Sequence, residues 1–221
     1  MNIIPNEYKR GYTKFLGCKI DLSKKVFIPR IETEYWVGKA IKDVGDSGFG
    51  VRGLRVLDMF AGSGCIGIAI LKNLKNSFVE FVDIDNKAIS QIKLNLKLNK
   101  ISHQRYKIYK SNFFEKLDRR KFDFIFANPP YVAKERIKEV QESVLKYEPK
   151  RALFSGRKGL THIKKFLKEA KRFLKKGGII YLEFDSLQKE EIQKILKKQK
   201  YKDFIFFKDQ FRKYRWVKIS L

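Results

Sequence analysis

Cysteine and histidine are scarce in this chain of 221 residues, which holds two of each. Cys18 and Cys65 are far apart, and neither belongs to a Cys-x-x-Cys pair. Disulfide frameworks and structural zinc sites need several such ligands at suitable spacing. Because His103 and His162 are the other soft ligands, the sequence argues against both kinds of site and predicts no bound metal.

Long apolar runs are also missing. No stretch reaches the roughly 20 apolar residues of a membrane helix, and the first residues lack a signal-peptide pattern. We therefore expect a soluble, cytoplasmic protein without membrane contact. Hydrophobic residues make up 43% of the chain, which is enough for a sizeable core. The length fits one large domain, or one domain with a small addition.

Acidic residues are few beside basic ones, with 24 Asp and Glu against 50 Lys and Arg and a formal net charge of +26. Such a charge attracts RNA, DNA or a ribosome-bound partner. The lysines of the carboxyl half also alternate with Phe166, Leu167 and Phe173 at helical spacing, as on solvated helix faces. The charge leaves both interpretations open and names no partner.

Strands and helices alternate along most of the chain, which predicts an α/β fold with a mostly parallel sheet and helices on both faces. We expect residues 1–50 to form a short extension and residues 51–221 the main domain. The elements expected in the extension are a hairpin with strands at Lys14–Ile20 and Lys25–Ile28 around a turn at 21–23, a helix at Glu32–Val44 and a glycine-rich loop at Gly45–Gly53.

In the main domain, apolar runs predict strands and helical periodicity predicts helices. The expected strands are Leu54–Met59, Phe78–Val82, Arg105–Tyr109, Phe122–Ala127, Ile179–Phe184, and an antiparallel pair at Phe204–Phe207 and Arg215–Ile219. The expected helices are Gly64–Leu74, Lys87–Leu98, Leu160–Leu174 with Gly177-Gly178 as its end, and Leu187–Lys198. Residues 134–157 have no clear form.

A glycine-rich loop joins the first of these strands to the first helix. Gly62, Gly64 and Gly67 spell GxGxxG, which lets the backbone approach a ligand at the helix start. Asp83 follows at about the distance of a carboxylate that accepts both hydroxyls of a ribose. The loop alone is compatible with NAD, with S-adenosylmethionine, and with a tight turn whose glycines serve packing.

Asn128-Pro129-Pro130-Tyr131 directly follows a buried strand. Neither proline has an N–H, both have a fixed φ, and Asn128 is pushed out of the helical region. The result is a stiff, carbonyl-rich corner that suits a planar NH2 group: the Asn128 side-chain oxygen and the Pro129 carbonyl accept its hydrogens, and Tyr131 covers its face. An ordinary proline-rich loop is the alternative.

The two loops are expected to open onto one crevice, because the strand before Asn128 should lie beside the strand before Gly62. A hydride-transfer enzyme needs no rigid amide clamp there, whereas a methyltransferase acting on a planar nitrogen does. S-adenosylmethionine is therefore the expected cofactor.

The chain resembles the release factor glutamine methyltransferases, the PrmC/HemK family, over almost its whole length. The segments that carry the resemblance are 27–34 (IPRPETE in the family), 56–68 (LDxGTGSGxIxI), 82–95 (VDISxxAL…N), 122–132 (FDxIxxNPPYI), 147–160 (YEPxxAL…dGL) and 183–188 (LExG…Q). The departures from the pattern are Ile31, Phe60-Ala61, Asn112 and Phe184-Asp185.

Family members usually carry an amino-terminal helical domain that grips the release factor. Because 27 residues precede Ile28, we expect either that other surfaces recognise the partner or that the protein substrate differs.

The resemblance implies a doubly wound, Rossmann-like methyltransferase domain with a mostly parallel seven-stranded sheet, preceded by a short hairpin and helix. It implies catalytic roles for Asn128, Pro129, Pro130 and Tyr131. It implies cofactor binding by Phe60, Ala61, Gly62, Ser63, Gly64, Asp83, Ile84, Asn112, Phe113 and Asn128. It implies substrate binding by Arg30, Glu32, Glu34, Asn128, Pro129, Tyr131 and Glu148.

The implied reaction is methyl transfer from S-adenosylmethionine to the side-chain amide nitrogen of a glutamine, in the Gly-Gly-Gln motif of peptide chain release factors. No strong base is needed before attack, which agrees with the absence of a histidine near Asn128 in the sequence. A release factor is then the expected partner, with ribosome or RNA contact through the basic surface as a further expectation.

Three alternatives stay open. The same corner would serve N6-adenine or N2-guanine methylation of RNA or DNA, on a base taken out of its stack. The second alternative is a basic RNA- or ribosome-binding protein whose methyltransferase fold is vestigial. The third is an enzyme that uses NAD.

Overall fold

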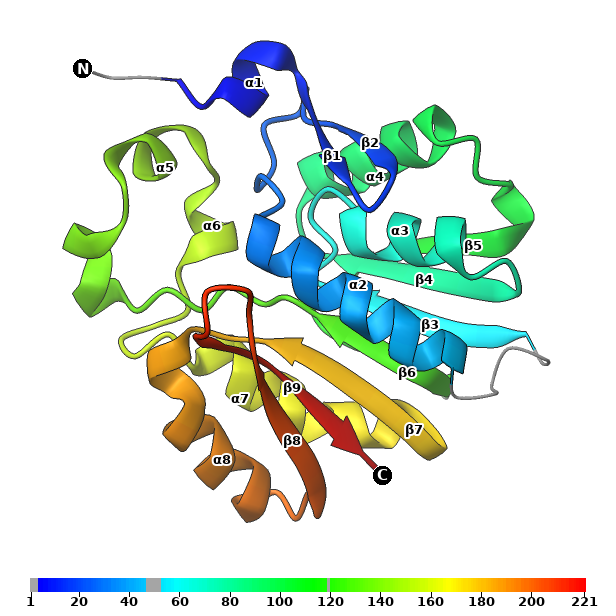
Figure 1. Cartoon of the computed structure of the whole chain (residues 1–221), viewed down its shortest axis with the longest axis vertical. Coiled ribbons are helices and arrows are strands. Elements are labelled where there is room, and N and C mark those ends of the chain that lie inside the picture. Colours follow the sequence, from blue (N-terminus) through cyan, green and yellow to red (C-terminus); the bar gives the residue numbers. More distant parts are fainter. Residues whose placement is uncertain (1–3, 47–52, 119) are drawn as a thin grey trace.

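The computed structural model describes residues 4–46, 53–118 and 120–221. Seven strands form one sheet in the order β5-β4-β3-β6-β7-β9-β8 (Figure 1). Their bounds are β3 Leu54–Met59, β4 Ser77–Asp83, β5 Tyr106–Lys110, β6 Phe122–Ala127, β7 Leu174–Glu183, β8 Asp203–Lys208 and β9 Tyr214–Ser220. Strands β3 to β7 pair in parallel, and β9 is antiparallel to β7 and to β8. The mostly parallel seven-stranded sheet is as predicted.

Helices cover both faces of this sheet because successive strand residues point to opposite sides. Val56 belongs to a hydrophobic cluster that includes residues of α2 (Ile31–Asp46), α3 (Cys65–Asn73) and α4 (Asn86–Leu98), whereas Leu57 belongs to a second cluster that includes residues of α7 (Thr161–Ala170) and α8 (Lys189–Lys198). The doubly wound arrangement follows from this alternation.

The predicted hairpin forms, but its predicted strands and turn were wrong. The pair consists of β1 (Tyr12–Phe15) and β2 (Cys18–Asp21), so the turn lies at Leu16-Gly17 and not at 21–23. Both turn residues have positive φ, 44° for Leu16 and 79° for Gly17, which suits a two-residue hairpin. Residues 25–28 form no strand and run along the candidate site described below.

The helix predicted at Leu160–Leu174 was too long. It ends at Ala170, a 3-10 turn follows at Lys171–Phe173, and Leu174 already pairs with Phe122 as the first residue of β7. Gly177-Gly178 therefore lies inside β7, where the pairing register shifts, and does not end the helix.

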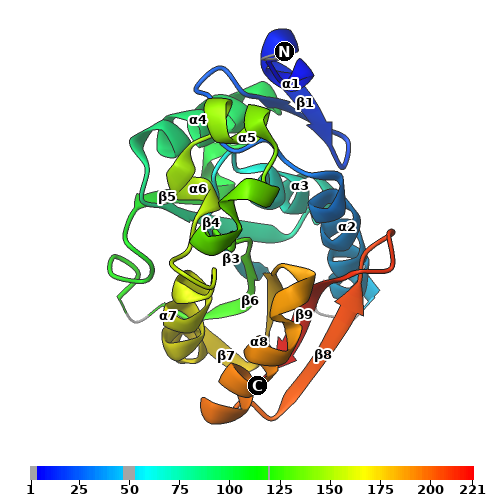
Figure 2. The same cartoon turned by 90° about the vertical axis from the view of Figure 1, so that its left-hand side faces the viewer.

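The region without a predicted form, 134–157, folds as short helices that lie beyond the carboxyl ends of β3 and β4 (Figure 2). They are the 3-10 turn Lys134–Glu139, α5 (Glu142–Tyr147) and α6 (Lys150–Leu153). The other short elements are α1 (Asn6–Arg10) and the 3-10 turns His103–Arg105 and Ser186–Gln188.

Helix α2 continues two residues past its predicted end, to Asp46. The rest of the predicted glycine loop, including the boundary expected between residues 50 and 51, lies largely outside the described residues. Among the residues described, no helix is long and apolar enough to cross a bilayer, and no group of three or more His, Cys, Asp and Glu is placed to hold a metal.

Candidate active site

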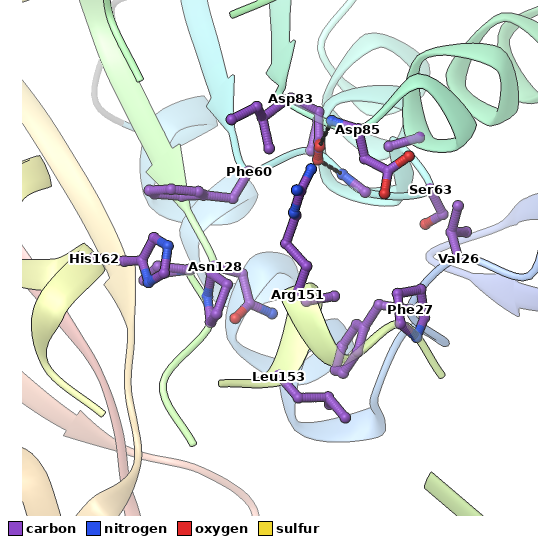
Figure 3. Close-up of a pocket in the computed structure, with 18 of the residues that line it drawn as sticks. Val26, Phe27, Phe60, Ser63, Asp83, Asp85, Asn128, Arg151, Leu153 and His162 are labelled. Carbon is purple, nitrogen blue, oxygen red and sulfur yellow. Dashed lines mark hydrogen bonds between the residues drawn. The ribbon is translucent and has the colours of Figure 1, made fainter. Parts of the chain in front are cut away.

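A cavity of about 410 Å³ opens at the carboxyl ends of β3, β4 and β6 (Figure 3). Its walls come from the β3–α3 loop, the end of β4, the Asn-Pro-Pro-Tyr corner after β6, residues 26–33 and the start of α6. The volume is in the range of sites that hold a small molecule. The two loops singled out in the sequence thus face a common space, because β3 and β6 are hydrogen-bonded neighbours.

The glycine loop turns sharply at the edge of this cavity. Phe60, Gly62 and Gly64 have positive φ values of 63°, 54° and 78°. Gly62 lines the cavity, whereas Gly64 does not, and a Cβ added at Gly64 would lie 3.1 Å from Ile92 Cγ1. Gly67 is tighter still, since a Cβ there would lie 2.2 Å from the Phe81 ring. Gly62 therefore shapes the cavity, and Gly64 and Gly67 permit packing of α3.

Asp83 ties the glycine loop to the end of β4. Its Oδ2 accepts a hydrogen bond from Gly62 N (2.8 Å), and its Oδ1 accepts one from Asp85 N (2.9 Å). Burial raises the pKa of Asp83, while these two N–H groups work in the opposite direction. A carboxylate so placed at a cavity wall can accept further hydrogen bonds from ligand hydroxyls.

Three rings form one corner of the cavity. Phe60 meets Phe113 edge to face at 5.3 Å, and Phe113 stacks on His162 at 6.0 Å between ring centroids. The sequence interpretation missed His162, because this residue lies 34 positions after Asn128. It lines the cavity because the first turn of α7, to which it belongs, lies beside the cavity. Burial lowers the pKa of His162, so its ring is neutral at pH 7, and Nδ1 lies 2.6 Å from Ser155 Oγ.

The Asn-Pro-Pro-Tyr corner lines the cavity with all four residues. The Asn128 side chain donates through Nδ2 to Thr33 Oγ1 (3.3 Å), and the Tyr131 hydroxyl donates to Glu183 Oε1 (3.1 Å). Just beyond the corner, Val132 N donates to Leu153 O (2.8 Å), which holds the chain against α6. This fixed corner can present acceptor oxygens to an NH2 group.

Of the residues with predicted site roles, the cavity gathers Arg30, Phe60, Ala61, Gly62, Ser63, Asp83, Ile84, Asn112, Phe113, Asn128, Pro129, Pro130 and Tyr131. It does not gather Gly64, Glu32, Glu34 or Glu148. Glu34 Oε1 accepts from Leu16 N (2.7 Å) and so holds the hairpin turn. Glu148 is buried, pairs with Arg30, and lines a second cavity that shares Arg30 with the first.

Arg151 is a further lining residue that the sequence interpretation missed. Its side chain extends from α6 across the cavity toward Asp83 at the end of β4 (Figure 3). No periodicity marks residues 134–157, so only the adjacent Tyr147-Glu148-Pro149 segment could have drawn attention to it.

The comparisons with known proteins agree with this geometry. Residues 14–157 match the methyltransferase small domain family. The chain is 33% identical over 218 residues to the release factor glutamine methyltransferase of Flavobacterium psychrophilum, covering 98% of this chain and 75% of that protein. It is 32% identical over 219 residues to the Clostridium botulinum protein of the same name, covering 98% and 76%.

A solved structure has the same fold. The hMettl16 catalytic domain, determined in complex with a hairpin from the MAT2A 3'UTR, superposes with a TM-score of 0.70 over 93% of this chain and 75% of that one, at 17% identity. Because that identity is low, the likeness concerns the fold alone. The matched family model and the two sequence relatives show that this chain belongs to the release factor glutamine methyltransferase family.

Proposed function

We propose that this protein transfers a methyl group from S-adenosylmethionine to the side-chain amide nitrogen of a glutamine in the Gly-Gly-Gln motif of a peptide chain release factor. One observation carries the proposal: the Asn128-Pro129 corner and the Asp83 carboxylate face the same cavity. Family membership supports the same reaction, because the relatives named above are release factor glutamine methyltransferases.

The cavity residues fit the proposed cofactor. Asp83 offers a carboxylate for ribose hydroxyls, and Gly62 leaves room for close backbone approach. Phe60, Ile84 and Phe113 offer an apolar surface for a planar base, with Ala61, Ser63 and Asn112 completing the loop regions around it. S-adenosylmethionine supplies a sulfonium-bound methyl group, so the cofactor carries the difficult part of the chemistry.

The residues of the corner act on the acceptor. A primary amide nitrogen is a weak nucleophile because its lone pair is delocalised into the carbonyl group. Asn128 Oδ1 and the Pro129 carbonyl accept its two hydrogens, which orients the nitrogen and favours localisation of the lone pair. Pro130 stiffens the turn and Tyr131 covers the face of the amide. This chain thus contributes positioning and fixed dipoles, and needs no strong base.

The predicted substrate-binding residues include some that line the cavity and some that do not. Arg30 lines the cavity, which supports its predicted role in substrate binding. The substrate-binding roles of Glu32, Glu34 and Glu148 stay predictions, since Glu34 and Glu148 contact protein groups. A release factor as partner, ribosome or RNA contact through the basic surface, and a cytoplasmic location belong to the same proposal.

The division into a 1–50 extension and a 51–221 methyltransferase domain is also proposed. The hairpin and α2 share one hydrophobic core with α3 and α4, so we expect the extension to fold together with the domain.

Incubation with labelled S-adenosylmethionine and a purified release factor tests the function. We expect the label in the Gly-Gly-Gln peptide and no label when its glutamine is replaced by glutamate. Asn128→Ala should abolish transfer while sparing cofactor affinity, because Asn128 is assigned to the acceptor. A release factor that stays unlabelled would overturn the proposal.

The second candidate function is methylation of an exocyclic amine of adenine or guanine in RNA or DNA. The net charge of +26 favours it, and the same corner would hold the amine. The experiment separates the two: incubation with a cell lysate, followed by protease or nuclease, should give label lost to protease only. Label lost to nuclease only would favour the nucleobase reaction.

A further inference from the structure

A buried hydrogen-bond network lies directly behind the Asn128 corner. Its centre is Glu183, at the end of β7, which is 1% exposed. Glu183 Oε2 accepts from Thr33 Oγ1 (2.8 Å) and from Trp36 Nε1 (2.6 Å), and Oε1 accepts from the Tyr131 hydroxyl (3.1 Å). Both Thr33 and Trp36 belong to α2, so the network joins three parts of the chain that are far apart in sequence.

The network has one direction. Trp36 Nε1 is donor-only, and a carboxylate is acceptor-only, so the hydrogen atoms point toward Glu183. Burial raises the pKa of Glu183, but the hydrogen bonds from Trp36 and Thr33 and the charge of Arg215 oppose this effect. The Tyr131 hydroxyl acts in the same direction, so four groups around the carboxyl work against the effect of burial on its pKa.

The direction of the network fixes the side-chain amide of Asn128. The single hydroxyl hydrogen of Thr33 goes to Glu183, so on its other side Thr33 Oγ1 can only accept. The group that donates to it is Asn128 Nδ2, at 3.3 Å. With the NH2 end of Asn128 engaged in this way, its Oδ1 is the end left for a ligand. Reversing the amide would set two acceptors against each other.

We propose that Thr33 and Glu183 are positioning residues that hold Asn128 Oδ1 toward the acceptor NH2 group. The same carboxylate also holds the Tyr131 hydroxyl, so one buried group orients both side chains of the corner. The inference rests on the proposed function, in which Asn128 receives an acceptor amide. Glu183 does not line the cavity and acts through Thr33 and Tyr131, whereas Thr33 lines the cavity and acts through its hydrogen bond with Asn128.

Thr33→Val tests the role of the hydroxyl, because valine has a similar shape but cannot accept from Asn128. We expect kcat for release factor methylation to fall by about 10–100-fold, as for a misplaced reacting group, with the affinity for S-adenosylmethionine nearly unchanged. The melting temperature should also fall, because Glu183 loses one buried hydrogen-bond donor. Thr33→Ser restores the hydroxyl and should restore most of kcat. Thr13→Val, at a partly exposed position of β1, is the control.

Two results would overturn the inference: a Thr33→Val enzyme with near-normal kcat, or a Thr33→Ser enzyme as slow as Thr33→Val. Glu183→Gln is the second variant if Thr33→Val does not fold. Its NH2 group replaces one acceptor oxygen by a donor, so kcat should again fall while cofactor affinity is kept, and Glu190→Gln on the exposed face of α8 is its control. A normal kcat for Glu183→Gln would equally overturn it.

The wild-type enzyme distinguishes this inference from the proposed function. If the wild type labels nucleic acid and not a release factor, the proposed function fails, and the same variants are compared on that acceptor. If the wild type labels the release factor and Thr33→Val does so at full rate, only the positioning role fails.

Discussion

Asp83 has two tasks at one site, since it anchors the Gly62 backbone and is assigned to the ribose of the cofactor. Asp83→Ala removes both. We expect affinity for S-adenosylmethionine to fall by roughly 10–150-fold, the equivalent of about 1.5–3 kcal/mol for a lost hydrogen bond to a charged group. Titration calorimetry measures it, with Asp203→Ala on exposed β8 as the control. Unchanged affinity, or tight NAD binding by the wild type, would contradict the assignment.

Asp58 is a second carboxyl at the residue scale, and it lies fully buried at the end of β3. Its Oδ2 accepts from Gly67 N (2.9 Å), and its Oδ1 has no hydrogen-bond partner among the described residues. Burial raises the pKa of Asp58 from 3.8 to about 7, the Gly67 N–H lowers it, and the Asp83 charge raises it. The folded protein therefore favours the protonated acid.

This shift predicts how stability changes with pH. Because the pKa of Asp58 is raised in the folded state, its protonated form contributes to the free energy of unfolding. This stabilisation is fully present below the unfolded-state pKa and is lost as pH rises toward 7. Asp58→Asn cannot ionise, so the free energy of unfolding of the variant relative to wild type should rise between pH 4 and pH 8, by at most about 4 kcal/mol. Urea unfolding at several pH values measures the difference. A difference that does not change with pH would mean that Asp58 is not held protonated.

At the scale of elements, the corner after β6 is supported by the segment that follows α6. Val132 bridges to Phe154, and Ser155 N donates to Val132 O (3.0 Å). Gly159 closes this contact with a φ of 72°, and a Cβ there would lie 2.1 Å from Tyr131 O. The corner and the segment can therefore approach each other only because residue 159 is glycine.

Gly159→Ala should both destabilise the protein and slow methyl transfer, because relief of the clash must move the carbonyl of Tyr131. Gly177→Ala is a matched control: its φ of 74° is as unfavourable for alanine, but its Cβ would meet nothing within 4 Å. We expect Gly159→Ala to cost at least about 1–3 kcal/mol more than Gly177→Ala, as for a strained core position, and to lower kcat in addition. Thermal unfolding and steady-state rates measure both. Equal costs for the two variants would show that the contact tolerates a methyl group.

The elements also show what the sequence could predict. Strands β3, β4 and β6 are buried apolar runs that end in glycine, acidic or proline signals, so their pattern located both loops of the cavity. The hairpin turn was misplaced because Asp21-Leu22-Ser23 has a stronger turn signal than Leu16-Gly17. Leucine rarely adopts the positive φ that Leu16 has in the fold, so its sequence did not indicate a turn. The Thr33–Glu183 contact could not be predicted at all, since it depends on how α2 docks beside β7.

At the scale of the whole molecule, charge is the dominant property. Helix α7 buries Ile163, Phe166 and Leu167 and exposes Lys164 and Lys168, so its lysines do lie on a solvated face. The exposed face of α7 that carries these lysines is also accessible to an acidic partner. Exposed charges act over about 8 Å at physiological ionic strength, so such a surface affects encounter more than chemistry.

We therefore expect kcat/KM for an acidic protein substrate to fall as salt rises, while kcat stays nearly constant. Replacing Lys164, Lys168 and Arg172 by Glu should reproduce the fall at low salt. Lys171 is left intact because its Nζ donates to Lys200 O (2.8 Å), so its loss would disturb the fold. Steady-state kinetics from low to physiological salt measure this. A kcat/KM that does not respond to salt would assign these side chains to solubility alone.

The strand order also constrains how the protein is made. Strand β9 follows β8 in the chain but lies between β7 and β8 in the sheet (Figure 1). A nascent chain that has emerged only through β8 has no partner for that strand, and one edge of β7 is open. Open edges invite pairing with other chains. The newly synthesised protein therefore carries open edges on β7 and β8 until β9 has left the ribosome, and these edges expose it to pairing with other chains during that interval.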